Sequence, residues 1–538
     1  MPHYGEHYTQ THIQNAALFC CNFSHFVASL PDFLAWAAQM LSHESAEGCP
    51  SAERARLRGR NMLSNHKTKI VATIGPASES PEMLERLIRA GLNVARLNFS
   101  HGDFAEHGRR IGRIRAAERA TGRRVAIMAD LPGPKMRLGR IEPEPIQLRP
   151  GASFTLTTGD VVGTEKRVAM SFERLPQVVK PGDLLFLNDG LVQLQVEGVA
   201  GPEVQCRVTV GGELRSRKGV NLPGINLGIS AFTERDRACL EFALAQGVDA
   251  LSQSFVETEA DLEAVRAAAR AVGKSPFLIA KIERAGALAH FEELMKAADG
   301  IMVARGDLGV EVPIQEIALT QKKLIAQANL AGKPVITATQ MLESMVSSRL
   351  PTRAEATDVA NAILDGTDCL MLSAESAVGQ YPEEAVAMLA KIAVATEAGR
   401  PQARLNDLRA LCLLQQPATE AAAIASVVEH ALETVPCVAV LVPTLSGTTA
   451  RMISRFKPAV WTIALSRQPA VCQSLVFSYG AHPVELEAEP EDWPAFTAAW
   501  LRQQNLHGPI AMLVAGPSPR HPEANHRIEF MRLEPEMK

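Results

Sequence analysis

The sequence predicts an α/β protein: a (β/α)8 barrel with an all-β lid domain inserted after its third strand, followed by a C-terminal doubly wound α/β domain. Three observations support this prediction. Apolar runs of the kind found in parallel strands recur eight times, and segments with helical periodicity separate them. One long gap in the series instead shows the alternating pattern of antiparallel strands.

The eight runs are rich in valine, isoleucine and leucine, as expected of strands that are buried on both faces. They are KIVATIG (69–75), VARLN (94–98), VAIMAD (125–130), ALSQSF (250–255), FLIAKIE (277–283), GIMVARG (300–306), PVITATQ (334–340) and CLMLSAE (369–375). Intervening segments such as SPEMLERLIRAG and EADLEAVRAAARAVG carry apolar residues at helical spacing. Eight such strand–helix units indicate a closed barrel, which we place at residues 66–131 and 222–395.

The gap between the third and fourth runs contains the predicted lid domain, residues 132–221. Its segments FTLTT, LLFLND, LVQLQVEG and VQCRVTVGG are β-branched and alternating, and Pro-Gly, Asp-Gly and Gly-Gly turns separate them. Beyond residue 395, VAVLVPTLSGTTARMISR reads as strand, loop and helix, and VWTIALS as a further strand. These patterns predict the C-terminal α/β domain at residues 396–538.

Residues 1–65 form a separate N-terminal extension that matches none of these patterns. Met62 lies just before the first barrel strand, so we consider two interpretations: a misassigned start codon, or an appendage that packs on the barrel or on a neighbour. The intact mass of the native protein distinguishes them.

Composition excludes several classes of protein. With 46% hydrophobic and 21% charged residues, the chain can form a large core. A net charge of −4 without a basic tract disfavours nucleic acid as a partner. The nine cysteines include no CxxC pair, which disfavours a zinc cluster or a disulfide framework. The most apolar N-terminal stretch (16–41) is too polar for a membrane span or signal core, so we expect a cytoplasmic protein.

Polar residues follow the predicted strands, where barrel enzymes build their sites. They are Arg96, Asn98, Asp130, Lys281, Glu283, Arg305, Asp307, Thr339 and Glu375. Any one of them could be a loop residue or part of a buried ion pair, but nine in register favour a site. Lys281 and Glu283 share one face of a strand, and Asp307 follows the next strand. Such a group can hold a divalent cation beside a bound anion, and a salt-bridge triad without metal is the alternative.

Six long motifs, in order, resemble those of the pyruvate kinase family. They are TKIVATIGPAS (68–78), NVARLNFSHG (93–102), KGVNLPG (218–224), MVARGDLGVE (302–311), ITATQMLESM (336–345) and PTRAEATDVANAILDGTD (351–368). The resemblance covers residues 67 to about 395 and is looser beyond. It implies phosphoryl transfer from phosphoenolpyruvate to ADP, giving pyruvate and ATP in the last step of glycolysis. It also implies a Mg²⁺ cofactor, with Mn²⁺ as a substitute, and a homotetramer.

The resemblance further implies roles for individual residues. Glu283 and Asp307 match the Mg²⁺ ligands, and a second Mg²⁺ would arrive with ADP. Lys281 matches the residue that stabilises the phosphoryl group in flight, and Arg96 the residue that holds the phosphate of phosphoenolpyruvate. The other matched positions are Thr339 with the amides of Gly306 and Asp307 for the substrate carboxylate, Thr339 and Ser373 for protonation of the enolate, and Thr73, Pro76, His101, Arg137 and Lys218 for the nucleotide.

One departure from the family pattern concerns potassium. Asn98, Ser100 and Asp130 match three ligands of the family's K⁺ site, but residue 131 is Leu where the family usually has Thr. Lys135 stands where K⁺-dependent members carry Glu. An ammonium group can sit among oxygen ligands much as K⁺ does. We therefore hypothesise that Lys135 replaces the ion and that K⁺ is not required; an exposed lysine without a role is the alternative.

A loop in the C-terminal region resembles the family's effector-phosphate loop. It comprises Thr444, Leu445, Ser446, Gly447, Thr448 and Thr449, and a helix follows it. The loop contains no basic residue, Arg451 is the nearest, and the tail from Gly516 to His521 differs from the family's usual ending. A sugar-phosphate effector, an unregulated site and an unused structural loop are all compatible with this sequence.

Two other functions fit part of the sequence. A metal-dependent, pyruvate-forming barrel lyase of the aldolase type would also use a Glu/Asp metal site and enolate chemistry. It would need neither the β lid nor Arg137 and Lys218. A catalytically dead metabolite sensor is disfavoured because four residues of the site are all intact: Lys281, Glu283, Asp307 and Thr339.

Overall fold

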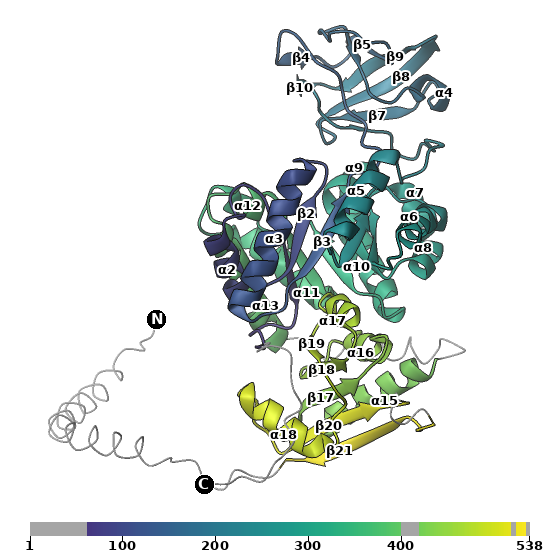
Figure 1. Ribbon diagram of the computed structural model, residues 1–538. Coiled ribbons are helices and arrows are strands. Elements are labelled where there is room, and N and C mark those ends of the chain that lie inside the picture. The colour runs from purple at the N-terminus through teal and green to yellow at the C-terminus, as the bar shows by residue number, and fades with distance from the viewer. Residues whose placement is uncertain (1–61, 400–418, 518–522, 534–538) are drawn as a thin grey trace, which may run out of the picture. The chain divides into compact units, whose positions relative to one another are not determined.

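The computed structural model describes residues 62–399, 419–517 and 523–533 (Figure 1). The predicted N-terminal extension lies outside these residues except for 62–65, and so do Arg520 and His521 of the predicted tail. The described residues all belong to one compact unit, which holds the barrel, the β insert and the C-terminal domain.

Eight parallel strands close into a barrel in the order β1-β16-β15-β14-β13-β12-β3-β2. Their bounds are β1 (Lys69–Thr73), β2 (Leu92–Asn98), β3 (Ala126–Leu131), β12 (Ala250–Gln253), β13 (Phe277–Ile282), β14 (Gly300–Ala304), β15 (Val335–Ala338) and β16 (Cys369–Leu372). Nearly every residue in them is buried, which explains the continuous apolar runs in the sequence. The predicted (β/α)8 barrel is confirmed.

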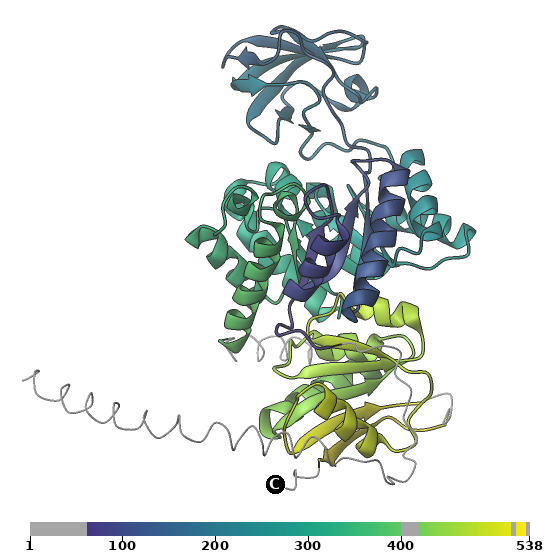
Figure 2. The same cartoon turned by 60° about the vertical axis from the view of Figure 1, so that its left-hand side comes forward.

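Helices surround the barrel strands in Figures 1 and 2. The longer ones are α2 (Pro81–Ala90), α3 (Phe104–Thr121), α5 (Glu234–Ala245), α6 (Glu259–Ala271), α8 (Phe291–Ala297), α10 (Ile317–Leu330), α11 (Arg353–Asp365) and α13 (Pro382–Ala398). The short ones are α7 (Ala285–Ala289), α9 (Arg305–Glu311), η1 (Ile314–Glu316), η2 (Glu343–Val346) and α12 (Ala374–Ala377). Local sequence sets several starts: α11, for example, begins with a capping box between Thr352 and Glu355.

The insert between β3 and β12 is an all-β domain apart from the short helix α4 (Leu175–Val178). Its strands are β4 (Ile146–Leu148), β5 (Ser153–Thr157), β6 (Arg167–Ala169), β7 (Leu184–Leu187), β8 (Val192–Ala200), β9 (Glu203–Val210), β10 (Gly212–Leu214) and β11 (Val220–Asn221). They form a six-stranded sheet, β11-β7-β8-β9-β5-β6, and a β10-β4 pair. Every second residue of β9 is buried between Val204 and Val208, so the predicted alternation is confirmed.

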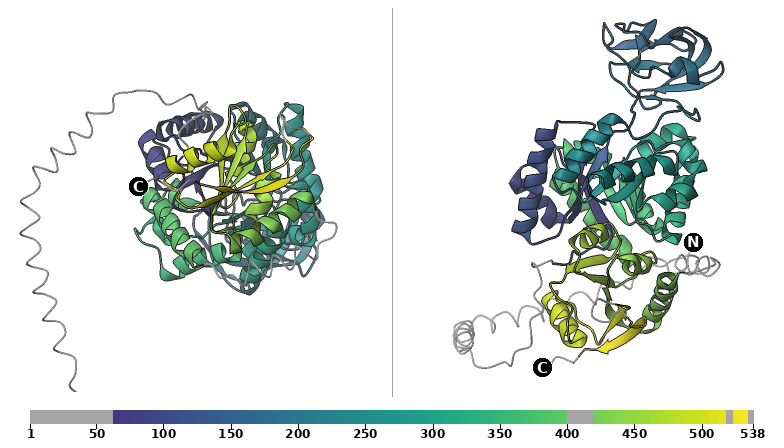
Figure 3. Two further views of the ribbon diagram at one scale, coloured as in Figure 1. Left: turned by 90° about the horizontal axis from the view of Figure 1, so that it is seen from below. Right: turned by 45° about the vertical axis from the view of Figure 1, so that its right-hand side comes forward.

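The C-terminal domain is a doubly wound α/β fold, as predicted. Its elements are α15 (Glu420–Thr434), β17 (Cys437–Pro443), α16 (Thr448–Ser454), β18 (Trp461–Ser466), α17 (Pro469–Leu475), β19 (Ala481–Glu485), α18 (Trp493–Gln503), β20 (Ile510–Ala515) and β21 (Arg527–Arg532). The sheet order is β19-β18-β17-β20-β21, and only β21 is antiparallel to its neighbour. Two separate apolar clusters cover its faces, one under α15 and α16 and one under α18. Figure 3 shows helices of this domain on both faces of its sheet.

Buried lysines connect the barrel to the C-terminal domain. The Lys69 ammonium at the start of β1 donates to Ala481 O of β19 at 2.8 Å, and burial lowers the pKa of Lys69 to about 8. The Lys457 ammonium lies 2.6 Å from Asp368 Oδ1, just before β16. These contacts involve the N-terminal ends of barrel strands, so they lie opposite the predicted active site.

Within residues 62–399, 419–517 and 523–533, no helix has both the length and the apolar character needed to cross a membrane.

Candidate active site

Arg96, Asp130 and Lys281 form one buried ionic group at the C-terminal ends of β2, β3 and β13. Arg96 Nε donates to Asp130 Oδ2 at 2.8 Å, and Arg96 Nη1 donates to Thr73 Oγ1 at 2.8 Å. The Lys281 ammonium lies 3.2 Å from Asp130 Oδ1. Burial alone would raise the pKa of Asp130, but Lys281 and Arg96 hold it below its usual range. Asp130 thus holds two cations side by side at the mouth of the barrel.

Lys281 also contacts Glu283, as expected from their shared strand face. The Lys281 ammonium lies 2.8 Å from Glu283 Oε1 and donates to Ser254 Oγ at 2.7 Å. Burial would lower the pKa of Lys281, but Asp130 and Glu283 outweigh it and raise that pKa. Lys281 is therefore a permanent cation at any ordinary pH.

Glu283 and Asp307 present two carboxylates to the same region. Glu283 Oε2 accepts a hydrogen bond from the Phe255 amide at 2.8 Å. Burial raises the pKa of Glu283, and the negative charge of Asp307 raises it further, against the opposing effect of Lys281. Such mutual repulsion is relieved when a cation binds between carboxylates.

The donor set at this point fits Mg²⁺. Carboxylate oxygens are hard ligands, and Mg²⁺ is commonly held by one or two of them, with water and substrate oxygens completing its shell. Across the described part of the chain, no cluster of three or more His, Cys, Asp or Glu side chains is arranged to hold a metal. A metal held by Glu283 and Asp307 would therefore depend on substrate oxygens for its remaining ligands.

Thr339 and Gln340, just after β15, both adopt left-handed backbone conformations, with φ of 67° and 53°. A non-glycine residue in this region costs about 1–2 kcal/mol, and β-branched residues such as threonine rarely adopt it. The Gly306 amide donates to Thr339 Oγ1 at 2.7 Å, and that hydroxyl donates to Ala338 O at 2.6 Å. The strained loop thus places the Thr339 hydroxyl beside the first turn of α9. The substrate-binding roles of Thr339 and Gly306 stay predictions.

Arg305 donates hydrogen bonds to the backbone of this strained loop. Its Nη2 donates to Thr339 O at 2.6 Å and to Gln340 O at 3.1 Å. Its Nη1 donates to both carboxylate oxygens of Asp358 in α11, at 2.7 and 2.9 Å. The sequence analysis named Arg305 as a polar strand-end residue and gave it no role. Its position directly before Gly306 and Asp307 is the one signal that could have pointed to it.

Ser373 and Glu375 lie at the end of β16. Glu375 is fully buried; its Oε2 accepts from the Ser373 amide at 2.7 Å and its Oε1 from the Leu342 amide at 3.2 Å. Glu375 therefore ties this turn to the segment that follows Thr339. Within the described residues, no hydrogen bond joins Ser373 to Thr339.

Two of the predicted nucleotide contacts, Arg137 and Lys218, lie at the base of the β insert. Arg137 and Gly219 form an antiparallel bridge, and the Leu138 amide donates to Lys218 O at 2.9 Å, so Arg137 and Lys218 lie on paired segments. Partial desolvation, followed by repulsion from Arg137 and Lys135, lowers the pKa of His101. Pro76 is exposed, whereas Thr73 Oγ1 donates to Leu372 O at 2.9 Å inside the barrel.

The residues predicted to form the monovalent-cation site make hydrogen bonds with their neighbours. Asn98 Oδ1 accepts from the Ser100 amide at 3.1 Å, and Asp130 Oδ1 accepts from Ser252 Oγ at 2.9 Å. The Lys135 ammonium is 3.7 Å from Asp307 Oδ1 and its side chain is 37% exposed. In the described part of the chain it makes no hydrogen bond or ion pair to the three predicted K⁺ ligands. Replacement of K⁺ by Lys135 stays a prediction.

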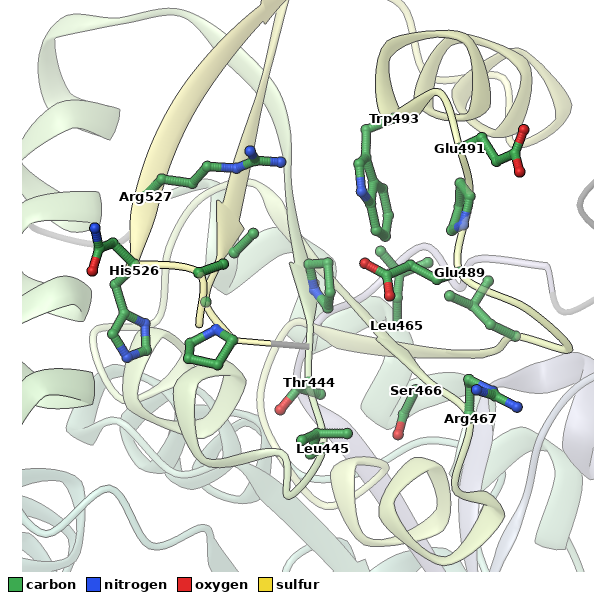
Figure 4. A pocket seen from close by; sticks show the side chains of 18 of the residues that line it. Thr444, Leu445, Leu465, Ser466, Arg467, Glu489, Glu491, Trp493, His526 and Arg527 are labelled. Carbon is green, nitrogen blue, oxygen red and sulfur yellow. The ribbon is translucent and has the colours of Figure 1, made fainter. Parts of the chain in front are cut away.

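The predicted effector loop is an ordered turn before α16. Gly447 has φ of 79° and its amide donates to Thr444 Oγ1 at 2.9 Å, while the hydroxyls of Ser446 and Thr448 lie 2.9 Å apart. A cavity of about 920 Å³ adjoins the loop (Figure 4). Residues that line it include Thr444, Leu445, Arg467, Glu489, Glu491, Trp493, His526 and Arg527.

A (β/α)8 barrel with a β insert after its third strand, a doubly wound C-terminal domain and buried cations at the strand ends defines a class of phosphotransferases. The pyruvate kinase barrel domain matches residues 65–386, and the pyruvate kinase alpha/beta domain matches residues 422–515. The chain belongs to the pyruvate kinase family and is a kinase.

Relatives of known identity resemble the chain over most of its length. It is 50% identical to a pyruvate kinase of Thermococcus litoralis over 422 residues, which covers 78% of this chain and 89% of the relative. It is 44% identical to one of Geobacillus stearothermophilus, covering 78% of this chain and 71% of the relative. A crystal structure of a pyruvate kinase from Cryptosporidium parvum superposes with a TM-score of 0.82 at 34% identity, covering 87% of this chain and 97% of that one.

Proposed function

We propose that this protein transfers the phosphoryl group of phosphoenolpyruvate to ADP, giving pyruvate and ATP, with Mg²⁺ bound by Glu283 and Asp307. The observation that carries the proposal is the buried group formed by Arg96, Asp130 and Lys281, with Glu283 against Lys281. It offers two fixed cations next to two carboxylates, which is what a phosphoryl donor and a divalent metal require together.

Phosphoryl transfer requires in-line positioning and neutralisation of charge more than covalent chemistry. Arg96 and Lys281 would bind the phosphate oxygens and stabilise charge as the group moves. Because Asp130 already holds both side chains in place, little reorganisation is needed when the substrate arrives. Bound Mg²⁺ would supply further positive charge to the phosphate and the leaving enolate.

The other residues would orient the substrates. The amides of Gly306 and Asp307 and the Thr339 hydroxyl would bind the substrate carboxylate, and Thr339 with Ser373 would lie on the proton route to the enolate carbon. Threonine is a weak acid, so this route requires a relay rather than direct donation. The β insert would close over the nucleotide and exclude water, carrying Arg137 and Lys218 toward ADP. Family resemblance supports a cytoplasmic homotetramer.

A coupled assay of pyruvate release from phosphoenolpyruvate, run with and without ADP, tests this function. We expect release only when both ADP and Mg²⁺ are present, with one ATP formed per pyruvate. Pyruvate formed from a larger hydroxy acid without ADP would instead support the barrel-lyase alternative. Absence of both reactions, with substrate still bound, would support the sensor.

We also expect activity without potassium. Replacing K⁺ by tetramethylammonium should change turnover less than about threefold, because the Lys135 ammonium supplies the positive charge. Loss of a hundredfold or more would rule this out. In the matched variant Lys135→Glu, turnover should fall in tetramethylammonium and recover on addition of K⁺.

A further inference from the structure

A second cavity, of about 580 Å³, is lined by residues of both the barrel and the C-terminal domain. Arg266 of α6 and Lys333, which precedes β15, line it from the barrel. Arg451 of α16 and the hydroxyl residues Ser446 and Thr448 line it from the C-terminal domain. It lies at the N-terminal ends of the barrel strands and is separate from the candidate active site.

The cations of this cavity lack enough carboxylates to balance them. Arg266 is paired with Asp299 at 3.0 Å. Lys333 Nζ donates only to a carbonyl, Ala298 O, at 2.5 Å, and Arg451 Nη2 donates to Ser446 O at 2.8 Å. Within residues 62–399, 419–517 and 523–533, neither Lys333 nor Arg451 forms an ion pair. The remaining charged residues of the lining are Lys274, which adds a further cation, and Asp249, which is paired with Arg115 at 2.6 Å.

Burial makes the charged forms of Lys333 and Arg451 less favourable. Burial lowers the pKa of Lys333, and the positive charges of Arg266 and Arg451 lower it further, although Asp299 opposes them. Burial likewise lowers the pKa of Arg451. An anion bound between Lys333 and Arg451 would relieve this repulsion and would be held in a partly desolvated site.

The predicted effector loop divides between the two cavities. Thr444 and Leu445 line the first cavity, whereas Ser446, Thr448 and Arg451 line the second. The first cavity also contains three carboxylates, of which Figure 4 shows two beside Trp493: Glu489, Glu491 and Glu523. Two of its basic groups are already paired, His526 with Glu420 at 3.3 Å and Arg527 with Glu529 at 3.8 Å. A dianion would meet like charges there and would be better accommodated in the second cavity.

We propose that the second cavity binds a phosphorylated small molecule, with its phosphate between Lys333 and Arg451 and within reach of the Ser446 and Thr448 hydroxyls. This assigns the effector chemistry to a different cavity from the one beside Thr444. Binding of a phosphate at this site does not depend on the proposed function. Only the effect of that binding on catalysis rests on the proposed function. Lys333 lies two residues before β15, and Thr339 follows the far end of that strand, so a ligand here would act on the strand that positions the active-site threonine.

Calorimetric titration of the full chain with inorganic phosphate and with glycerol 3-phosphate tests the proposal. Arg451→Gln and Lys333→Gln should each weaken binding to this site about tenfold or more, because each removes one unpaired cation. The matched variant Arg467→Gln, in the first cavity, should bind like the wild type. None of the three substitutions changes a catalytic residue. Any phosphate binding at Arg96 and Lys281 should therefore contribute equally to the titrations of all three variants.

Three results would overturn the proposal: binding lost in Arg467→Gln and kept in Arg451→Gln, equal binding in all variants, or no phosphate bound beyond one catalytic site. Lys333 and Arg451 lie in different domains, so misfolding of one variant leaves the other as a test. The titration needs no turnover. A chain that binds phosphate here but makes no pyruvate would refute the proposed function alone.

Discussion

Replacing Lys281 with methionine should lower turnover by about a thousandfold or more while phosphoenolpyruvate still binds. Lys281 is a fixed cation held by Asp130 and Glu283, and its proposed charge stabilisation is greatest when the phosphoryl group is between donor and acceptor. Losing it therefore raises the barrier more than it weakens the ground state. Steady-state kinetics should show the effect in kcat, and substrate titration should show affinity within about tenfold of the wild type.

The control for this variant must also remove a buried, paired lysine. Lys457 meets that requirement, since its ammonium lies 2.6 Å from Asp368 far from the strand C-termini. Lys457→Met should lower the melting temperature but leave turnover per folded molecule near normal. Equal turnover in Lys281→Met and the wild type would refute the role given to Lys281. Equal losses in the two lysine variants would show that the loss reflects packing.

Replacing Arg305 with methionine should lower kcat about a hundredfold. Arg305 donates hydrogen bonds to Thr339 O and Gln340 O in the loop and to both carboxylate oxygens of Asp358 in α11. Without these hydrogen bonds from the guanidinium group, Thr339 and Gln340 can leave the left-handed region and recover about 1–2 kcal/mol each. The Thr339 hydroxyl would then move from the site. Arg305→Lys should restore little, because lysine cannot make the planar fork.

A neighbouring ion pair supplies the matched control. Lys322 of α10 pairs with Asp365 of α11 at 2.5 Å and joins helices of the same part of the barrel without touching the Thr339 loop. Lys322→Met should match Arg305→Met in its effect on the melting temperature but keep kcat. Asp358→Asn should lower kcat about tenfold, since Arg305 keeps its carbonyl contacts. If Arg305→Met lowered the melting temperature but left kcat unchanged, the positioning role of Arg305 would be contradicted.

Much of the fold followed from the sequence because its signals are local. Strands such as β13 are buried on both faces, so their apolar runs are continuous. The ends of parallel strands meet at one rim, so Lys281 and Asp130 could be expected near each other although they are far apart in the chain. The β9 alternation likewise predicted a half-buried antiparallel strand.

Other parts of the site depend on tertiary contacts that leave little trace in the sequence. The left-handed conformation of Thr339 is opposed by its own side chain and exists because Arg305 and Asp358 support it from other elements. The effector loop divides between two cavities, and Arg451 of α16 lies on the side of the second, where it donates to Ser446 O. Neither feature has a periodicity or a spacing from which it could be predicted.

The most direct test of the account is Mn²⁺ binding in the presence of phosphoenolpyruvate and without ADP, measured by electron paramagnetic resonance. The account predicts one tightly bound Mn²⁺ per chain, weakened about tenfold or more in both Glu283→Gln and Asp307→Asn. Glu311→Gln, which changes another partly buried acid of α9, should bind like the wild type. Mn²⁺ bound equally tightly in the two carboxylate variants and the wild type would contradict the claim that Glu283 and Asp307 share the working metal.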